Sequence, residues 1–325
     1  MSSTTTEENS ICELNPNFCF ISGIVYEILA IAGLLINSAL IIIFIQRQYC
    51  KRDAALIPSL SLIFCDLCHL IIFAVHVGPE LIKADQSPWN IQDSLTNCSV
   101  FYFWVVDLFH LAYICNVRYN ATCRYVNFRL CFTRRKFVVY TVAIWILGFV
   151  VCLLPIFRSI FHWPIFSINI SLAEDMNESS DDNGLEYLLH FLHAMLITYM
   201  LYCYSICIFY MKQASKKFTT TTNEDNPVRK ILIRNQRRTF RASINYFLIT
   251  VIFIILVITW LVYKIFGTSY VTFTLKKVAY LVNSTLPALM LFAMNSSVKN
   301  YLASFFQSKS DTVVNLTMVK NIQVR

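Results

Sequence analysis

The sequence predicts an all-α protein, an integral membrane bundle of seven transmembrane helices with its N-terminus outside and its C-terminus inside. Three observations predict this fold class. Only 14% of the 325 residues are charged, and the mean hydropathy is +0.56, which is untypical of a soluble globule. Seven apolar runs each reach the length of about 20 residues that a helix needs to cross a bilayer. Basic residues gather between alternate runs, on one side of the membrane.

The seven apolar runs define the predicted helices. No lipid-exposed backbone group can remain unpaired in a bilayer, so only helices and closed barrels span it. Barrels show short alternating segments, whereas these runs are apolar throughout. The predicted spans are Phe20–Ile45, Ala54–Val77, Val100–Tyr119, Phe137–Phe157, Tyr187–Met211, Ile244–Phe266 and Phe273–Met294.

Basic residues predict the orientation of the bundle. They lie around Arg47–Arg52, in the loop after the third run, in the basic segment Lys212–Arg241 and in the C-terminal tail. Cytoplasmic loops carry such an excess of Lys and Arg. The outer side keeps only Lys83, Arg158, Lys264, Lys276 and Lys277. The net charge of +8 therefore indicates membrane topology, and we expect no nucleic-acid partner.

The chain divides into three parts. Residues 1–19 are polar and acidic and lack the basic start of a cleavable signal peptide, so we expect an extracellular segment. Residues 20–306 form the seven-helix domain, whose last part, Ser297–Phe306, has the pattern of a short amphipathic helix on the inner leaflet. Residues 307–325 form a polar cytoplasmic tail.

Two modifications are expected on the outer side. The triplets that begin at Asn97, Asn169 and Asn177 are glycosylation acceptors if they are lumenal. Of the 12 cysteines, Cys12, Cys19 and Cys98 face the oxidising side. We expect Cys98 to pair with Cys12 or Cys19, because the second outer loop offers no cysteine. A Cys12–Cys19 bond is the alternative.

Ionisable residues within the apolar runs are the first candidates for function, since charge inside a membrane is costly. Asp66 and Asp107 are predicted to form one polar site with Asn283 and Ser284. Two neighbouring carboxylates repel, so one must be protonated or a cation must lie between them. For Glu27, His69 and His110 we favour structural hydrogen bonds between helices.

The outer part of the third run is rich in aromatic residues. Phe101 and Trp104 are candidate ligand-pocket residues, together with His190 and His193 on the fifth run. The aromatics equally fit an interfacial belt. Two histidines without a third ligand are weak evidence for a metal, so we predict no metal site there. The sequence has no phosphate loop, HExxH motif or nucleophile elbow, and we expect no enzyme.

Several positions resemble the G-protein-coupled receptor superfamily, over about residues 20–306. The resembling residues are Asn37 in the first helix, Leu62 and Asp66 in the second, Trp145 in the fourth, and Pro287 and Asn295 in the seventh. Arg118 and Arg124 compete for the arginine at the end of the third helix. We place Arg118 there because its spacing to Trp145 fits better, although Cys123-Arg124-Tyr125 resembles the usual triplet more by eye.

The segment Arg118-Tyr119-Asn120-Ala121 with Phe132-Thr133 resembles nematode chemosensory serpentine receptors, class x most of all. The chain departs from better-known groups, since no acid precedes Arg118 and the second outer loop has no cysteine. These departures are compatible with the divergent nematode receptors.

The resemblance implies a plasma-membrane receptor that senses a small external chemical and signals to a heterotrimeric G protein. Arg118 and Tyr119 would carry the coupling, and a sodium ion would occupy the polar site, with no other cofactor. Lys276 and Lys277 fall at the outer end of the predicted seventh helix, which argues against bound retinal. A ligand-gated channel or a transporter is the alternative function. The charge bias counts against insect-type odorant channels, which have the opposite orientation.

Overall fold

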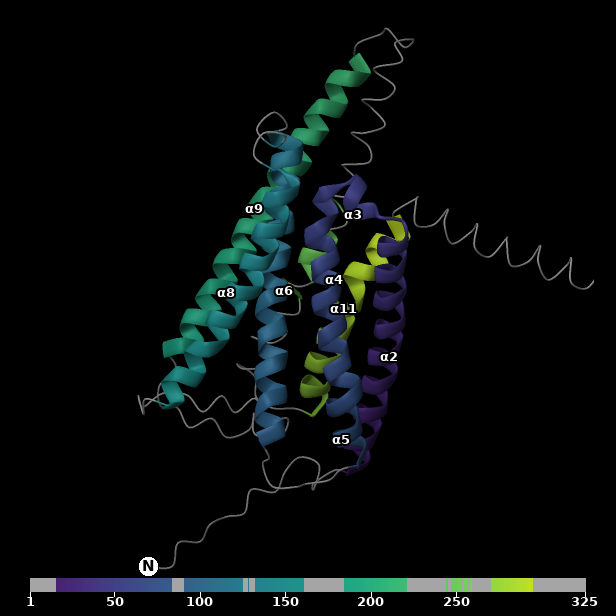
Figure 1. Ribbon diagram of the computed structural model, residues 1–325, viewed down its shortest axis with the longest axis vertical. Helices are drawn as coiled ribbons and strands as arrows, with labels where there is room; N and C mark the ends of the chain where they lie inside the picture. Colours follow the sequence, from purple (N-terminus) through teal and green to yellow (C-terminus); the bar gives the residue numbers. More distant parts are fainter. Residues whose placement is uncertain are drawn as a thin grey trace, which may run out of the picture.

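The protein is an elongated bundle of roughly parallel and antiparallel helices (Figure 1). The computed structural model describes residues 16–83, 91–124, 128, 132–160, 184–220, 244, 247–252, 254–255, 258 and 270–294. Within these residues every regular element is helical. The glycosylation candidates Asn169 and Asn177, the amphipathic segment Ser297–Phe306 and the tail lie outside them.

Helix α2 (Pro16–Gln46) is the predicted first membrane helix. It starts four residues before the predicted Phe20, at a proline whose missing N–H is tolerated in a first turn. It ends where Gln48 adopts a left-handed backbone with φ of 52°. This reversal leads into the short α3 (Tyr49–Arg52) and the 3-10 turn η1 (Ala54–Leu56), where the Asp53 side chain accepts a hydrogen bond from Ala55 N at 3.1 Å.

The second membrane helix is built from three consecutive pieces. They are α4 (Ile57–Ile72), the π-helical turn η2 (Phe73–Val77) and α5 (Gly78–Lys83). Pro79 has no N–H to donate, so the preceding turn is where a wider hydrogen-bonding pattern is tolerated. The helix therefore extends six residues past the predicted end at Val77.

The remaining described helices are longer than predicted. They are α6 (Ile91–Cys123), α8 (Arg134–Ile160), α9 (Gly184–Thr220) and α11 (Tyr270–Met294), with Pro287 inside α11. Amphipathic ends that leave the hydrocarbon lack the apolar signal on which the predicted boundaries rest. The predicted sixth helix, Ile244–Phe266, falls largely outside the described residues, and its described positions are helical.

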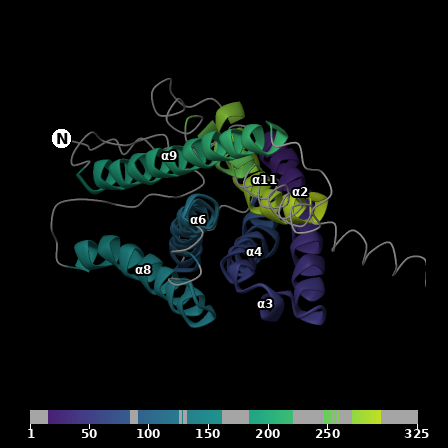
Figure 2. The same ribbon diagram turned by 90° about the horizontal axis from the view of Figure 1, so that it is seen from above.

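Helix α6 occupies the centre of the bundle (Figure 2). It packs against α4, α8 and α9, while α2 packs against α4, α5 and α11. Half of the most apolar stretch of α6 is buried, compared with 22% for α8. Asp107 and His110 of α6 are buried between helices, whereas α8 turns most of its apolar side chains outward.

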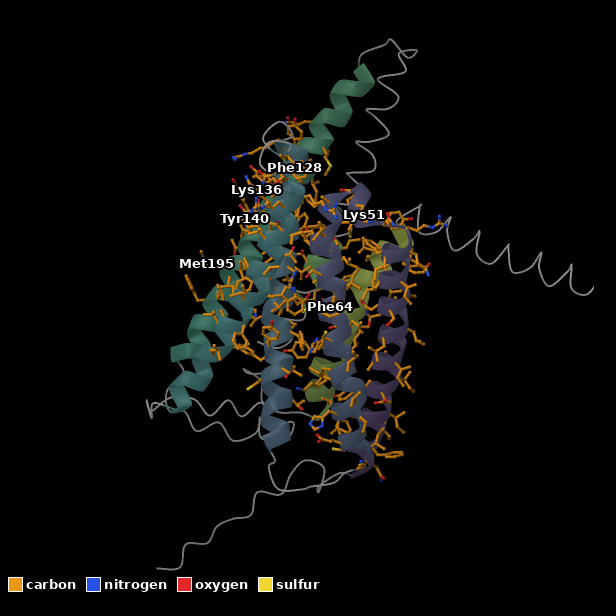
Figure 3. All side chains as sticks on the ribbon, viewed as in Figure 1. Lys51, Phe64, Phe128, Lys136, Tyr140 and Met195 are labelled. Atoms are coloured by element: carbon orange, nitrogen blue, oxygen red, sulfur yellow. The ribbon has the colours of Figure 1, made fainter. Side chains whose placement is uncertain are left out.

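The outward surface matches a membrane protein. Five described helices are long and apolar enough to cross a bilayer, and α11 contains the shorter apolar stretch Tyr280–Phe292. Phe64, Tyr140 and Met195 are exposed along the sides of the bundle, at 51%, 46% and 57% (Figure 3). Lys51 and Lys136 both lie toward the same end of the bundle, the end that the charge pattern predicts to be cytoplasmic (Figure 3).

Candidate functional site

A polar cluster lies buried in the middle of the bundle, where three helices meet. Asp66 comes from α4, Asp107 from α6, and Asn283 and Ser284 from α11. All four are at most 5% exposed. Asn283 Nδ2 donates a hydrogen bond to Asp107 Oδ2 at 3.1 Å, and Asp66 is close enough to Asp107 for their charges to interact. The structure thus brings the four predicted residues into one place.

Asn37 connects helix α2 to the polar cluster. Asn37 Nδ2 donates to the backbone oxygens of Gly33 at 2.9 Å and of Ser284 at 3.1 Å. His69, one turn outward of Asp66 on α4, shares a hydrogen bond of 3.0 Å between its Nδ1 and Ser284 Oγ. Four helices are therefore joined by hydrogen bonds at this depth.

Three acceptor oxygens of the cluster have no hydrogen-bond partner. They are Oδ2 of Asp66, Oδ1 of Asp107 and Oδ1 of Asn283, all buried. Orphaned acceptors away from water cost free energy, and either protons or an oxygen-binding cation would satisfy them. Two carboxylates and an amide oxygen are the hard oxygen ligands that a sodium ion accepts. The residues present therefore fit the expected cation.

A second network ties α4, α6 and α8 together through Ser61. Trp145 Nε1 donates to Ser61 Oγ at 2.8 Å, and His110 Nε2 lies 2.9 Å from the same oxygen. His110 Nδ1 is 2.8 Å from the backbone oxygen of Val106. Both ring nitrogens of His110 are thus satisfied within the bundle. The contacts agree with the structural role predicted for this histidine.

An aromatic group lies outward of the polar cluster. Trp104 Nε1 donates to His193 Nε2 at 2.8 Å, which joins α6 to α9. The Trp104 ring meets Tyr280 of α11 edge-on, with ring centroids 4.7 Å apart. Trp104 and His193 are therefore brought together as a candidate pocket wall. Phe101 is half-buried on α6, and the side chain of His190 lies outside the described residues.

The other aromatics of the same run face α8. Tyr102 packs against Trp145 and Phe149, and Phe103 packs against Trp145. Within the described residues, the Trp104 ring contacts His193 of α9 and Tyr280 of α11, whereas the rings of Tyr102 and Phe103 contact α8. Tyr102 and Phe103 therefore pack between helices α6 and α8, while the pocket and the interfacial belt both remain predictions for this run.

The sequence matches the family of seven-transmembrane receptors called the rhodopsin family, over residues 36–300. The chain belongs to this family. Its fold is similar to that in the crystal structure of squid rhodopsin, with a TM-score of 0.70 and 14% sequence identity. The match covers 89% of this chain and 85% of that one. No curated protein matches the sequence significantly.

Membership of this family confirms the predicted seven-helix receptor fold. The protein is a multi-pass membrane receptor rather than an enzyme. In the described part of the chain, no three His, Cys, Asp or Glu side chains come close enough together to hold a metal ion. The polar cluster is not such a group of three, because two of its four members are the amide of Asn283 and the hydroxyl of Ser284.

The inner end of the receptor carries both candidate arginines. Arg118 is half-buried within α6, next to Tyr119, which packs against the core around Leu111 and Cys115. Helix α6 continues to Cys123, so Arg118 lies more than one turn before the helix end and not at the end itself. Arg124 follows that end, exposed, with its guanidinium carbon 5.6 Å from the centroid of the Tyr119 ring.

Thiols line the contact between α6 and α9 near this inner end. Cys115 lies beside Cys203, and Cys123 beside Cys207. Cys115 Sγ also lies 3.5 Å from the Met200 backbone oxygen. On the adjacent inner loop, Cys50 is half-buried, and burial raises the pKa of its thiol, with Asp53 adding to the effect.

The disulfide expected from Cys98 is wrong. Cys98 has a free thiol, and Cys19 is disulfide-bonded to a cysteine outside the described residues. Cys98 lies on α6 beside Cys152 of α8, whereas Cys19 belongs to a core cluster centred on α2. The Cys98 thiol therefore lies near α8 and not near Cys19 of α2. Asn97, the third glycosylation candidate, is in α6, and its side chain is not among those described.

Sequence reasoning missed Lys277. The predicted seventh helix began at Phe273, which left this lysine at the outer end. Helix α11 begins at Tyr270, and Lys277 lies two turns inside it, only 7% exposed. An earlier start of this helix could have been predicted from Val271–Leu275, because apolar residues continue through this segment before the lysine pair.

Proposed function

We propose that this receptor is a chemoreceptor of the plasma membrane that binds a small external chemical and signals to a heterotrimeric G protein. One observation carries the proposal. The central helix α6 bears three functional candidates in order of depth: Trp104 in the outer aromatic group, Asp107 in the polar cluster, and Arg118 near the inner end. A ligand that contacts the first can bias the packing of the same helix at the last.

The nematode chemosensory group, class x above all, is our proposed subfamily. Its support is the segment from Arg118 to Ala121 together with Phe132-Thr133. Glycans on Asn169 and Asn177 are part of the same proposal, because these residues lie in the second outer loop of the predicted topology.

Arg118 and Tyr119 are the proposed coupling residues. A planar guanidinium with five donors can hold several backbone carbonyls of a docked protein, which lysine does poorly. The half-buried position of Arg118 supports this role, since a separation of the inner helix ends would expose it. Arg124 is the competing residue and is exposed in the structure.

A sodium ion is proposed between Asp66, Asp107 and Asn283. The three buried oxygens without partners support it. A cation there offsets the repulsion between two carboxylates, and it links α4, α6 and α11. Such an ion would stabilise the resting packing, because any change in helix spacing separates its ligands.

The test is expression of the full chain with promiscuous G proteins and a screen of volatile and water-soluble chemicals. We expect at least one chemical to raise G-protein activation in cells that express the receptor and not in matched cells that lack it. A current evoked by the chemical without any G protein would instead support the channel alternative.

A further inference from the structure

The first turn of α8 concentrates positive charge at one end of the bundle, the end that the charge pattern predicts to be cytoplasmic. The helix begins with Arg134, Arg135 and Lys136, and all three side chains are exposed. This turn contains no acidic residue, and none of the three cations forms an ion pair with a residue that the structure describes. Because the N-terminal end of a helix is itself electropositive, cations there are unfavourable unless an anion lies nearby. The turn therefore lacks a counter-charge.

Helical spacing separates Arg134 from the other two cations. Residues three or four positions apart lie on the same face of a helix. The face that starts at Arg134 continues through Phe137 and Thr141, which are only 2% and 8% exposed. Arg134 therefore lies toward the neighbouring helices, where its charge reaches the thiol of Cys50 on α3. Arg135 and Lys136 remain for the outer surface of α8.

These two cations stand at the head of an apolar surface that faces the bilayer. We call this surface the α8 strip, and its members, all 46–59% exposed, are Val139, Tyr140, Val142, Ile146 and Leu147. Lys136 and Tyr140 follow one another along the side of the bundle (Figure 3). From Arg135 to Ile146 the helix rises about 16 Å, which is about the depth of one leaflet of a bilayer. The surface thus has the charge and the length to accommodate a single anionic lipid.

We infer that α8 binds a polyphosphorylated inositol phospholipid of the inner leaflet, whose phosphates contact Arg135 and Lys136 and whose acyl chains lie along the α8 strip. The guanidinium fork of Arg135 matches a phosphate group with two parallel hydrogen bonds, and Lys136 adds a point charge beside it. A headgroup with several phosphates carries more negative charge than phosphatidylserine, which suits two adjacent cations at the positive end of a helix. The inference is independent of the proposed external ligand and G protein, because it concerns only the membrane-facing surface of α8.

A binding measurement on the purified full-length receptor, in micelles of a neutral detergent, tests this inference. The probe is fluorescently labelled phosphatidylinositol bisphosphate, and its fluorescence polarisation gives the Kd. Unlabelled phosphatidylinositol bisphosphate, phosphatidylserine and free inositol trisphosphate are the competitors. We expect phosphatidylserine and the free headgroup each to compete about tenfold more weakly than the unlabelled bisphosphate lipid, since the first lacks charge and the second lacks acyl chains.

Two outcomes of this competition would overturn the inference. Equal competition by phosphatidylserine would mean that the surface attracts any anionic lipid. Equal competition by inositol trisphosphate would mean that a free phosphate compound is bound and that the α8 strip contributes nothing.

Variants of the two cations locate the site. The double variant Arg135→Gln with Lys136→Gln should raise the Kd of the probe by about 30-fold, as expected for the loss of two cations that each attract an anionic lipid. Lys51→Gln with Lys212→Gln is the matched control, because both lysines are exposed in predicted inner segments and the loss of charge is the same. The control should leave the Kd nearly unchanged. An equal rise of the Kd in both double variants would show that net charge alone attracts the lipid, and the site would be lost.

Folding of the variants is checked by their unfolding temperatures without lipid. Removing cations from the first turn of α8 should not lower this temperature, because they oppose the helix dipole. If the double variant did not fold, the single variants Arg135→Gln and Lys136→Gln would carry the test, each with a Kd about fivefold higher. The exchange variant Arg135→Lys with Lys136→Arg keeps both charges and should bind the probe nearly as well as the native receptor. Unchanged probe binding in both single variants would overturn the inference.

Discussion

The middle and the inner end of the bundle are held together by different forces. In the middle, Asn283 and Asn37 donate directed hydrogen bonds across helices, and several buried oxygens remain without partners. At the inner end, α6 meets α9 through apolar side chains and the thiols of Cys115 and Cys203. Directed bonds fix one geometry, whereas apolar and thiol contacts lose little when helices slide. Hydrogen bonds between polar groups therefore fix the middle of the bundle, whereas contacts of lower directionality hold α6 to α9 at the inner end.

The largest expected effect is at the inner end. Arg118→Ala should abolish G-protein activation while surface expression and ligand binding persist, because the residue acts on the partner and not on the fold. Ligand-stimulated nucleotide exchange, beside surface labelling and ligand binding, measures this.

Arg124→Ala is the matched comparison, since Arg124 is exposed and follows the helix end. If Arg124→Ala lost activation and Arg118→Ala kept it, the coupling arginine would be Arg124. The proposed assignment of Arg118 would then be wrong by six residues. An unaltered response in Arg118→Lys would reduce Arg118 to a headgroup anchor.

The middle is expected to respond to sodium. Asp66→Asn removes one carboxylate and should abolish the sodium dependence of agonist potency, which we expect to be about tenfold in the native receptor, about 1.4 kcal/mol of coupling. Agonist concentration curves in sodium and in choline buffers measure it. Glu27→Gln is the control, because Glu27 packs against Gly78 of α5, away from the cluster. Sodium sensitivity that survives in Asp66→Asn would remove the ion from this site.

A smaller effect is expected at the second network. Ser61→Ala leaves Trp145 Nε1 and His110 Nε2 without their shared partner and should lower the free energy of unfolding by about 1–2 kcal/mol. Ser61→Thr keeps the hydroxyl and should cost less. Thermal unfolding of the purified receptors compares them. If the two variants were equally stable, the hydroxyl would contribute nothing to joining the three helices.

The smallest effect concerns the thiols of the inner end. Cys207→Ala should change the unfolding free energy by less than about 1 kcal/mol, since thiols are weak donors and acceptors. In the native receptor, mild oxidation should link Cys123 to Cys207, and non-reducing peptide mapping detects the bond. Cys68, half-buried on α4, is the control that should stay unlinked. Absence of a Cys123–Cys207 link would mean that α6 and α9 are further apart there.

Particular residues show how far the sequence could lead. The grouping of Asp107 with Asp66 followed from placing each on its helix at the same depth, whereas the hydrogen bond between Asn283 and Asp107 is known only from the structure. The neighbours of Cys98 did not follow, because the rotation of α6 about its axis decides whether a side chain meets α2 or α8. The hydrogen bond between His69 and Ser284 could not be predicted either, since it depends on the spacing of α4 and α11.

The sequence by itself determined the number of helices and their order, because apolar length acts locally along the chain, and its loop charges predict the orientation of the bundle. It also determined which helices carry ionisable groups. Only the tertiary structure decided which of these groups meet, that Trp104 contacts α9 and α11, and that Lys277 is buried. Those outcomes depend on the rotation and extent of each helix, and these are set by packing between segments far apart in the chain.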